Sequence, residues 1–179
     1  MTYAQATEFL FGLRRFGWRL GLETVERLLA LLDNPQVRVP SIHIGGTNGK
    51  GSTAAMLSAI LREAGYRTGL YTSPHLLDFT ERIRLNDVPI GADQVAQLTT
   101  QLKDLCSMHF ASQPIPNPPS DRLPHPTFFE LTTAMAFLHF AHRAFWPALI
   151  LAIADADILR LRRMPFAPSA ASALLTPSN

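Results

Sequence analysis

Residues 42–52 read Ile-His-Ile-Gly-Gly-Thr-Asn-Gly-Lys-Gly-Ser, and the local structures that this stretch implies indicate the architecture of the chain. The alternating apolar residues Val39, Ile42 and Ile44 predict a β-strand that ends at Ile44. A glycine-rich turn follows, and the apolar stretch that opens at Ser52 predicts a helix. A strand, a glycine-rich loop, a lysine and a helix in this order are typical of phosphate-binding sites.

The loop, residues 45–52, supplies the groups that a phosphate site needs, and we refer to it as the phosphate loop. Its glycines let the backbone approach a ligand and turn N–H groups toward it. The first turn of the following helix adds unpaired N–H groups and the positive end of the helix dipole. Lys50 adds a mobile positive charge, and Thr47, Ser52 and Thr53 add hydroxyl groups.

The phosphate loop departs from the general P-loop pattern in two ways. Only three residues separate Gly45 from the Gly49-Lys50 pair, and Gly51 separates Lys50 from Ser52. A glycine-rich turn that merely joins a strand to a helix is the alternative interpretation. The coincidence of strand, loop, lysine and helix favours the phosphate site over that alternative.

With these two departures, the phosphate loop resembles the ATP loop of one family, the folylpolyglutamate synthases and dihydrofolate synthases, which are Mur-type amide ligases. Four segments carry the resemblance, in the order of the family, over about residues 18–150. They are Leu-Gly-Leu-Glu (20–23), Gly-Thr-Asn-Gly-Lys-Gly-Ser (46–52), Ser-Pro-His-Leu followed by Glu-Arg-Ile (73–83), and Thr-Phe-Phe-Glu-Leu-Thr (127–132).

The resemblance implies a site for ATP, Mg²⁺ and a folate-type substrate. Lys50 is implied to be the catalytic cation on the outer phosphates, and Ser73 matches a magnesium ligand of the family. The implied ATP-binding residues are Thr47, Asn48, Gly49, Lys50, Gly51 and Ser52, and the implied substrate-binding residues are Leu20, Gly21, Leu22, His75, Phe128, Phe129 and Glu130.

Several of these residues also have simpler interpretations. Ser73 can belong to an ordinary turn at the end of a strand, and His75 can be a loop residue. Glu23 lies where a helix is predicted to begin, so it can simply favour the helix dipole. Glu130 follows Thr127 at the spacing of a capping box, and the two phenylalanines before it are core aromatics by default.

Members of the family join glutamate to a folate-type carboxylate at the expense of ATP. The carboxylate attacks the γ-phosphate to give an acyl phosphate, and the glutamate amine then displaces phosphate to form an amide. A phosphate cradle, a lysine and Mg²⁺ together shield the charge in such a reaction. The alternatives are a nucleotide-binding module of another P-loop class without ligase activity, and a non-catalytic remnant.

The composition bounds the kinds of protein that this chain can be. Its 179 residues suffice for a domain with a core, and its net charge of +2 comes with no basic run that would indicate nucleic acid. The single cysteine, Cys106, excludes an internal disulfide. Residues 144–154 form the longest apolar stretch and are too short to span a bilayer. No secretory signal is visible, so we expect a cytoplasmic monomer with small-molecule substrates and with neither nucleic-acid nor membrane partners.

The apolar spacing predicts an α/β fold, specifically a doubly wound, mainly parallel sheet with helices on both faces. The resemblance implies that ATP lies at the strand ends. A strand-helix-strand unit around the phosphate loop implies parallel strands. Helices are predicted at residues 4–16, 22–32, 52–64, 93–106 and 127–144. One strand is predicted to end at residue 44, and two others are predicted at 67–72 and 148–153. A hairpin is predicted near 82–87 and a proline-rich loop at 112–126.

The chain leaves the family pattern near residue 152. Members of the family run to more than twice this length, and a glycine-rich signature after the corresponding strand supplies a glutamate for magnesium. Here Ala152 stands at the glutamate position and the glycines are missing. We expect residues 1–153 to form part of an ATP-binding domain, residues 154–179 to be an irregular tail produced by truncation or a frameshift, and the C-terminal ligase domain to be absent. Little or no ligase activity is then expected of the chain alone.

Overall fold

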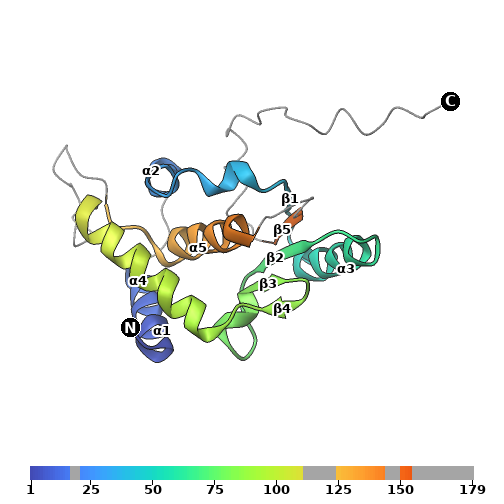
Figure 1. The fold of residues 1–179 in the computed structure, drawn as a ribbon, viewed down its shortest axis with the longest axis horizontal. Coiled ribbons are helices and arrows are strands. Elements are labelled where there is room, and N and C mark those ends of the chain that lie inside the picture. The colour runs from blue at the N-terminus through green and yellow to red at the C-terminus, as the bar shows by residue number, and fades with distance from the viewer. Residues whose placement is uncertain (17–20, 111–123, 144–149, 155–179) are drawn as a thin grey trace.

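The computed structural model of the protein describes residues 1–16, 21–110, 124–143 and 150–154 (Figure 1). A five-stranded sheet with the order β1-β5-β2-β3-β4 forms its centre. The strand β5 pairs in parallel with β1 on one side and with β2 on the other, whereas β2, β3 and β4 pair antiparallel. The strands are β1 (Ser41–Ile44), β2 (Thr68–Thr72), β3 (Ile83–Leu85), β4 (Val88–Pro89) and β5 (Ile150–Ala154).

The prediction of parallel strands on either side of the phosphate loop is confirmed, but β1 and β2 are not neighbours. The strand predicted at 148–153 is β5, and it lies between them. Ile44 and Thr72, the last residues of β1 and β2, both align with Ala154. Because neighbouring strands lie about 4.8 Å apart, the ends of β1 and β2 are separated by roughly 10 Å at one edge of the sheet.

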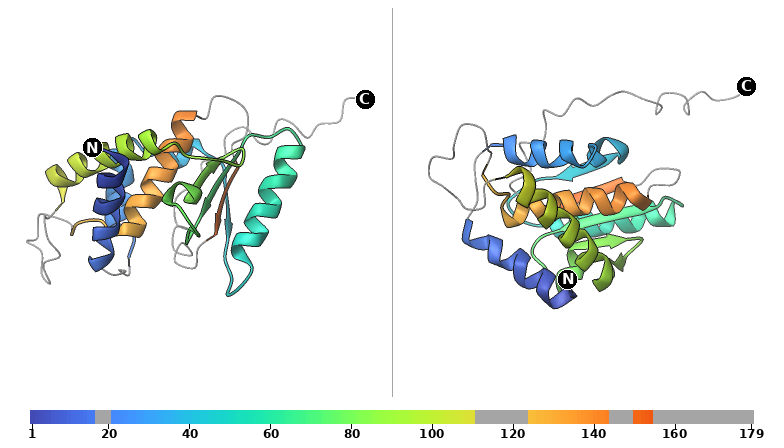
Figure 2. Two further views of the ribbon diagram at one scale, coloured as in Figure 1. Left: turned by 90° about the horizontal axis from the view of Figure 1, so that it is seen from below. Right: turned by 60° about the vertical axis from the view of Figure 1, so that its left-hand side comes forward.

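Helices cover both faces of the sheet, as the doubly wound architecture requires. The helix α3 (Lys50–Glu63) packs on one face against β1, β2 and β5, and α5 (Phe128–Arg143) lies on the other (Figure 2). Three further helices pack against α5, namely α1 (Tyr3–Gly12), α2 (Glu23–Leu31) and α4 (Ala92–His109). Short 3₁₀ helices are η1 (Leu13–Phe16), η2 (Pro35–Arg38) and η3 (Phe79–Arg82).

The helix α5 is the centre of the core, because every residue from Leu131 to Phe140 is buried. It has the sheet on one side and helices around the rest, so it shows no polar face. The Tyr71 hydroxyl of β2 and Thr132 Oγ1 of α5 are hydrogen-bonded at 2.9 Å. A Cβ added at Gly69 of β2 would lie 3.0 Å from the Phe140 ring, so the strand and the helix approach closely there.

Several predicted boundaries differ from the structure. The helix after the phosphate loop begins at Lys50, two residues before the predicted Ser52, because Gly49 already takes the N-cap position. The helix predicted at 4–16 ends at Gly12 and continues as the 3₁₀ turn η1, and the helix predicted at 93–106 extends to His109. Most of the predicted loop at 112–126 and nearly all of the tail lie outside the described residues. Within the described part, no helix is long and apolar enough to cross a membrane.

Candidate functional site

The phosphate loop connects β1 to α3 at the carboxyl end of the strand. Gly49, the N-cap residue of α3, has φ 77°, and Gly46 has φ 151°, both in the region that favours glycine. The first helical hydrogen bond runs from Thr53 N to Gly49 O at 2.9 Å. The amides of residues 50–52 therefore precede any helical acceptor and are the group that a helix start offers to an anion.

The Lys50 side chain folds back over the phosphate loop. Its Nζ donates to Gly46 O at 2.7 Å and to Thr47 O at 3.2 Å. The ammonium group therefore lies beside the helix N-terminus, so both sources of positive potential act at one place. Thr53 has a structural partner, because its hydroxyl donates to Gly49 O at 3.0 Å.

Ser73 follows β2 at the same edge of the sheet, across β5 from the phosphate loop. Its Oγ accepts a hydrogen bond from Arg82 Nη1 at 2.9 Å. The same guanidinium donates from Nε to His75 Nδ1 at 2.7 Å. Arg82 is 2% exposed. Arg82 lies within the Glu-Arg-Ile match but is not among the residues predicted from the sequence, because nothing in the spacing shows which side chains it reaches.

Aromatic rings and guanidinium groups gather around His75. We define the ring cluster as Phe11, His75, Phe79 and Phe128, which come from α1, the loop after β2, η3 and α5. Phe11 and Phe128 are stacked with centroids 5.8 Å apart, and Phe11 and His75 are also 5.8 Å apart. The guanidinium carbon of Arg14 lies 4.7 Å from the Phe11 centroid, and that of Arg82 lies 5.1 Å from the Phe128 centroid.

The ring cluster is aromatic and lies beside two guanidinium groups, with Phe79 turned edge-on to the other rings. Burial lowers the pKa of His75 below its ordinary value, and the charges of Arg82 and Arg14 lower it further. His75 is therefore neutral near pH 7, while the guanidinium groups carry the positive charge. Such a surface suits an aromatic ring that carries anionic or carbonyl groups.

The remaining candidate substrate residues do not all join the ring cluster. Phe129 points elsewhere than Phe128 and packs against Tyr71 with centroids 6.5 Å apart. Glu130 Oε2 accepts from Thr127 N at 2.7 Å and from Thr127 Oγ1 at 2.8 Å, while Glu130 N donates to Thr127 Oγ1 at 3.3 Å. These contacts form a reciprocal cap at the start of α5, which is the simpler of the two interpretations.

The segment 20–23 is only partly described, because Leu20 lies outside the described residues. Leu22 is the N-cap residue of α2 and packs partly buried against the core, and Glu23 is the first helical residue. Gly21 has φ 122°, and a Cβ there would overlap the Glu23 carboxylate. The described residues of this segment thus form a tight entry into α2.

Two carboxylates, Glu81 and Asp78, hold the loop between Ser73 and η3. Glu81 accepts from the amides of Leu76 at 2.9 Å, Leu77 at 3.1 Å and Asp78 at 3.0 Å. These hydrogen bonds lower the pKa of Glu81. Asp78 accepts from the Tyr3 hydroxyl at 2.7 Å, which ties the loop to α1.

Magnesium has few protein ligands available in this site. Among the described residues, no group of three or more His, Cys, Asp or Glu side chains could hold a metal ion. The oxygens at the site are the neutral hydroxyls of Ser73 and of the phosphate loop. Mg²⁺ keeps several waters and is commonly bound through substrate phosphates with one or two protein ligands. The residues therefore fit Mg²⁺ that arrives with a nucleotide, and they do not fit an independent metal centre.

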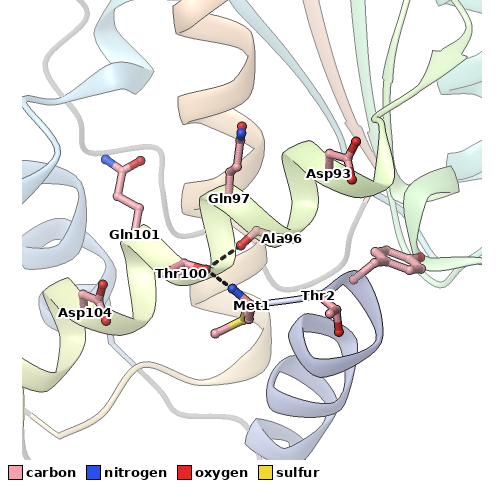
Figure 3. Close-up of a pocket in the computed structure, with 9 residues that line it drawn as sticks. Met1, Thr2, Asp93, Ala96, Gln97, Thr100, Gln101 and Asp104 are labelled. Atoms are coloured by element: carbon pink, nitrogen blue, oxygen red, sulfur yellow. Dashed lines mark hydrogen bonds between the residues drawn. The ribbon is translucent and has the colours of Figure 1, made fainter.

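A separate groove of about 610 Å³ lies between the N-terminus and α4 (Figure 3). Its Asp93 and Asp104 lie about three helical turns apart on α4, and the Met1 amine donates to Thr100 Oγ1 at 3.5 Å. Its lining residues include no member of the phosphate loop or the ring cluster. The groove is therefore distinct from the candidate site.

The curated relatives and the solved structures that resemble this chain point to one family. No protein-family model matches the chain. The chain is 37% identical over 139 residues to the dihydrofolate synthase/folylpolyglutamate synthase of Bacillus subtilis. The matched part is 78% of this chain but 30% of that protein, so the chain spans less than a third of the length of this relative.

Solved structures agree with the sequence comparison. Mycobacterium tuberculosis folylpolyglutamate synthase complexed with ADP superimposes with a TM-score of 0.67 and 34% identity, covering 84% of this chain and 32% of that one. A complex of folylpolyglutamate synthase (FPGS) with AMPPCP and folate superimposes with a TM-score of 0.69 and 26% identity. The superposition covers 89% of this chain and 38% of that one. The described fold is therefore that of the N-terminal, Mur-ligase-like domain of these enzymes.

Proposed function

Because this chain belongs to the family of folylpolyglutamate and dihydrofolate synthases, we propose that it carries the nucleotide- and folate-binding part of such a ligase. The reaction is the ATP-dependent joining of L-glutamate to the carboxylate of a folate or of dihydropteroate. One observation carries the proposal: the Lys50 ammonium lies over a glycine-rich loop at the start of α3, at the carboxyl edge of the sheet.

Nucleotide binding uses the phosphate loop. The amides of residues 50–52 and the positive end of α3 receive the phosphate oxygens, and Lys50 exchanges its carbonyl partners for the outer phosphates. Thr47, Asn48 and Ser52 complete the loop around them. The ADP complex of the Mycobacterium tuberculosis relative supports this assignment.

The chemical step begins with the substrate carboxylate. Its oxygen attacks the γ-phosphorus, the bond to the β-phosphate oxygen breaks, and ADP leaves with that electron pair to give an acyl phosphate. The glutamate amine then attacks the acyl carbon, inorganic phosphate leaves, and the amine loses a proton as the amide forms. Lys50 acts here as a catalytic cation that offsets charge on the transferred phosphoryl group.

Magnesium would be held through the nucleotide phosphates and the Ser73 hydroxyl. When bound, it supplies further charge shielding for the phosphoryl group. Ser73 lies across β5 from the phosphate loop, at a separation of roughly 10 Å between strand ends, which a triphosphate with its metal can bridge.

The folate-type ring is placed at the ring cluster. Phe128 and His75 belong to it, and Gly21, Leu22, Phe129 and Glu130 shape the neighbouring helix starts. The stacked rings of Phe11 and Phe128 offer apolar surface, and the exposed guanidinium group of Arg14 beside them offers hydrogen-bond donors. The AMPPCP and folate complex of a relative supports a folate-type ligand.

A nucleotide-binding module without ligase activity is the second candidate. The departure of the sequence from the family pattern at Ala152, in the middle of β5, favours it for the chain on its own. Both candidates require nucleotide binding, and only the ligase requires the ring cluster to bind a folate.

The test is a thermal-shift titration of ATP with and without Mg²⁺, because a ligand that binds only the native state stabilises it. At 100 times the dissociation constant, the free energy of unfolding should rise by about 2.7 kcal/mol. Lys50→Ala should abolish most of this shift, whereas Lys103→Ala, on α4, should keep it. No shift with the folded wild-type protein would refute the proposed function.

A further inference from the structure

Arg82 joins two side chains that lie two residues apart in the loop after β2. Its Nε donates to His75 Nδ1 at 2.7 Å and its Nη1 donates to Ser73 Oγ at 2.9 Å. The guanidinium group is planar, so two donors on one rigid fork set the relative positions of both acceptors. A lysine, with a single ammonium group, has no such fork.

These two hydrogen bonds constrain the protons of both partners. Because His75 Nδ1 accepts, the neutral imidazole carries its proton on Nε2. Because Ser73 Oγ accepts from Arg82, its own proton and remaining lone pair are directed away from the guanidinium group. Arg82 therefore selects one tautomer of His75 and one orientation of Ser73.

Arg82 is itself held from several sides. It ends η3, whose start is capped reciprocally by Asp78 and Glu81. Its guanidinium carbon lies 5.1 Å from the Phe128 centroid and 6.0 Å from the Phe79 centroid. Burial at 2% exposure keeps water from competing for its donors. The fork is thus fixed by α5 and η3 before any ligand binds.

We propose that Arg82 is a positioning residue of the candidate site, which holds the Ser73 hydroxyl and the His75 ring ready for the nucleotide with its metal and for the folate-type ring. It acts through these two side chains and makes no contact with the reacting atoms. This inference rests on the proposed function, since that function makes Ser73 and His75 site residues.

The first test examines the geometry without a ligand. Nitrogen-15 NMR of the histidine rings, with His75 assigned by a His75→Gln variant, should show His75 in the Nε2–H tautomer in the wild type. Arg82→Met should allow both tautomers, and Arg84→Met should leave His75 unchanged. Arg84 is the matched control, because it lies two residues along the chain and contacts Glu81 O and Asp87 instead. An Nδ1–H tautomer in the wild type would overturn the inference.

The second test is a double-mutant cycle on the affinity for ATP with Mg²⁺. Ser73→Ala and Arg82→Met should each weaken binding about tenfold, the range for losing a hydrogen bond to a charged group. The double variant should bind no more weakly than Ser73→Ala alone, because Arg82 acts on the nucleotide through Ser73. Additive losses would show that Arg82 acts independently and would overturn the inference.

Two controls separate the possible failures. Circular dichroism and a melting curve establish that each variant folds, and Arg82→Lys, which keeps the charge, replaces Arg82→Met if the latter unfolds. The population of the His75 Nε2–H tautomer should stay lower in Arg82→Lys than in the wild type. If the folded wild type fails to bind ATP, the proposed function falls together with the role of Arg82 in it; if it binds but the cycle is additive, only the role of Arg82 falls.

Discussion

Gly49 and Lys50 show how much of the candidate site depends on single residues. Gly49 takes a left-handed conformation at the N-cap of α3, which lets the chain turn from the loop into the helix. Lys50 then starts the helix with its ammonium group over the loop carbonyls. The turn at Gly49 and the charge of Lys50 therefore occupy adjacent positions at the start of α3.

Gly49→Ala should therefore destabilise the protein by about 1 kcal/mol, because an alanine at φ 77° is strained even where space is open. Gly51→Ala is the matched control. A Cβ at Gly51 also meets open space, its φ is not positive, and it lies within the helix, where alanine is favoured. Urea unfolding measures both, and equal effects of the two substitutions would contradict the explanation.

His139 is a second residue with a measurable signature. It is buried in α5, and burial first, then the charges of Arg143 and His142, lower its pKa to about 4. The unfolded chain binds a proton at about pH 6.5, so the folded state loses stability as pH falls from about 6.5 toward 4. The loss from this group should reach about 3 kcal/mol at most.

Denaturant midpoints between pH 7 and pH 4.5 measure this effect. His139→Leu should flatten the dependence, whereas His109→Gln, at the exposed end of α4, should keep it. A wild-type profile that is level over this interval would show that His139 does not contribute as described.

At the scale of elements, the contact between β2 and α5 joins the site to the core. Gly69 permits α5 to cross β2 closely, and Tyr71 is hydrogen-bonded to Thr132 on the same helix. The end of this strand leads to Ser73, and the start of this helix carries Phe128. The packing of one pair of elements therefore sets the distance between the ring cluster and the carboxyl edge of the sheet.

Gly69→Ala should lower the free energy of unfolding by about 1–3 kcal/mol, because its Cβ would lie 3.0 Å from two atoms of the Phe140 ring. Gly12→Ala, at the end of α1, meets no atom within 4 Å and should be close to neutral. Adding Phe140→Leu to Gly69→Ala should recover part of the loss. Chemical unfolding of the four proteins provides the comparison, and a neutral Gly69→Ala would mean that the ring moves without cost.

At the scale of the whole molecule, the chain corresponds to a part of its relatives. It spans 30% of the Bacillus subtilis protein, and the departure at Ala152 falls in the central strand β5. The phosphate loop, Ser73 and the ring cluster nevertheless lie within the described residues. Binding and catalysis can therefore be separated experimentally.

We expect the purified 179-residue chain to bind ATP and to form no detectable amide bond between labelled glutamate and either folate or dihydropteroate. The reason is that Ala152, in β5, stands where the family pattern has a glutamate that binds magnesium. A full-length relative assayed in parallel supplies the positive control. Robust incorporation of labelled glutamate by the chain alone would disprove this prediction.

Local features were accessible from the residues. The phosphate loop, the parallel strands beside it and the reciprocal cap of Thr127 and Glu130 follow from glycine, hydroxyl and carboxylate chemistry within a few positions. Apolar periodicity was sufficient to place the helices and the strand at 148–153, although helix ends shifted by several residues.

Long-range juxtapositions became visible only in the folded chain. The insertion of β5 between β1 and β2, and the stacking of Phe11 on Phe128, join residues more than eighty positions apart. Arg82 lies fewer than ten positions from its partners Ser73 and His75, yet the direction of its guanidinium group depends on its packing against α5 and η3. Spacing along a chain reports hydrogen bonds and periodicity nearby, whereas strand order and side-chain contacts depend on which apolar surfaces are buried together.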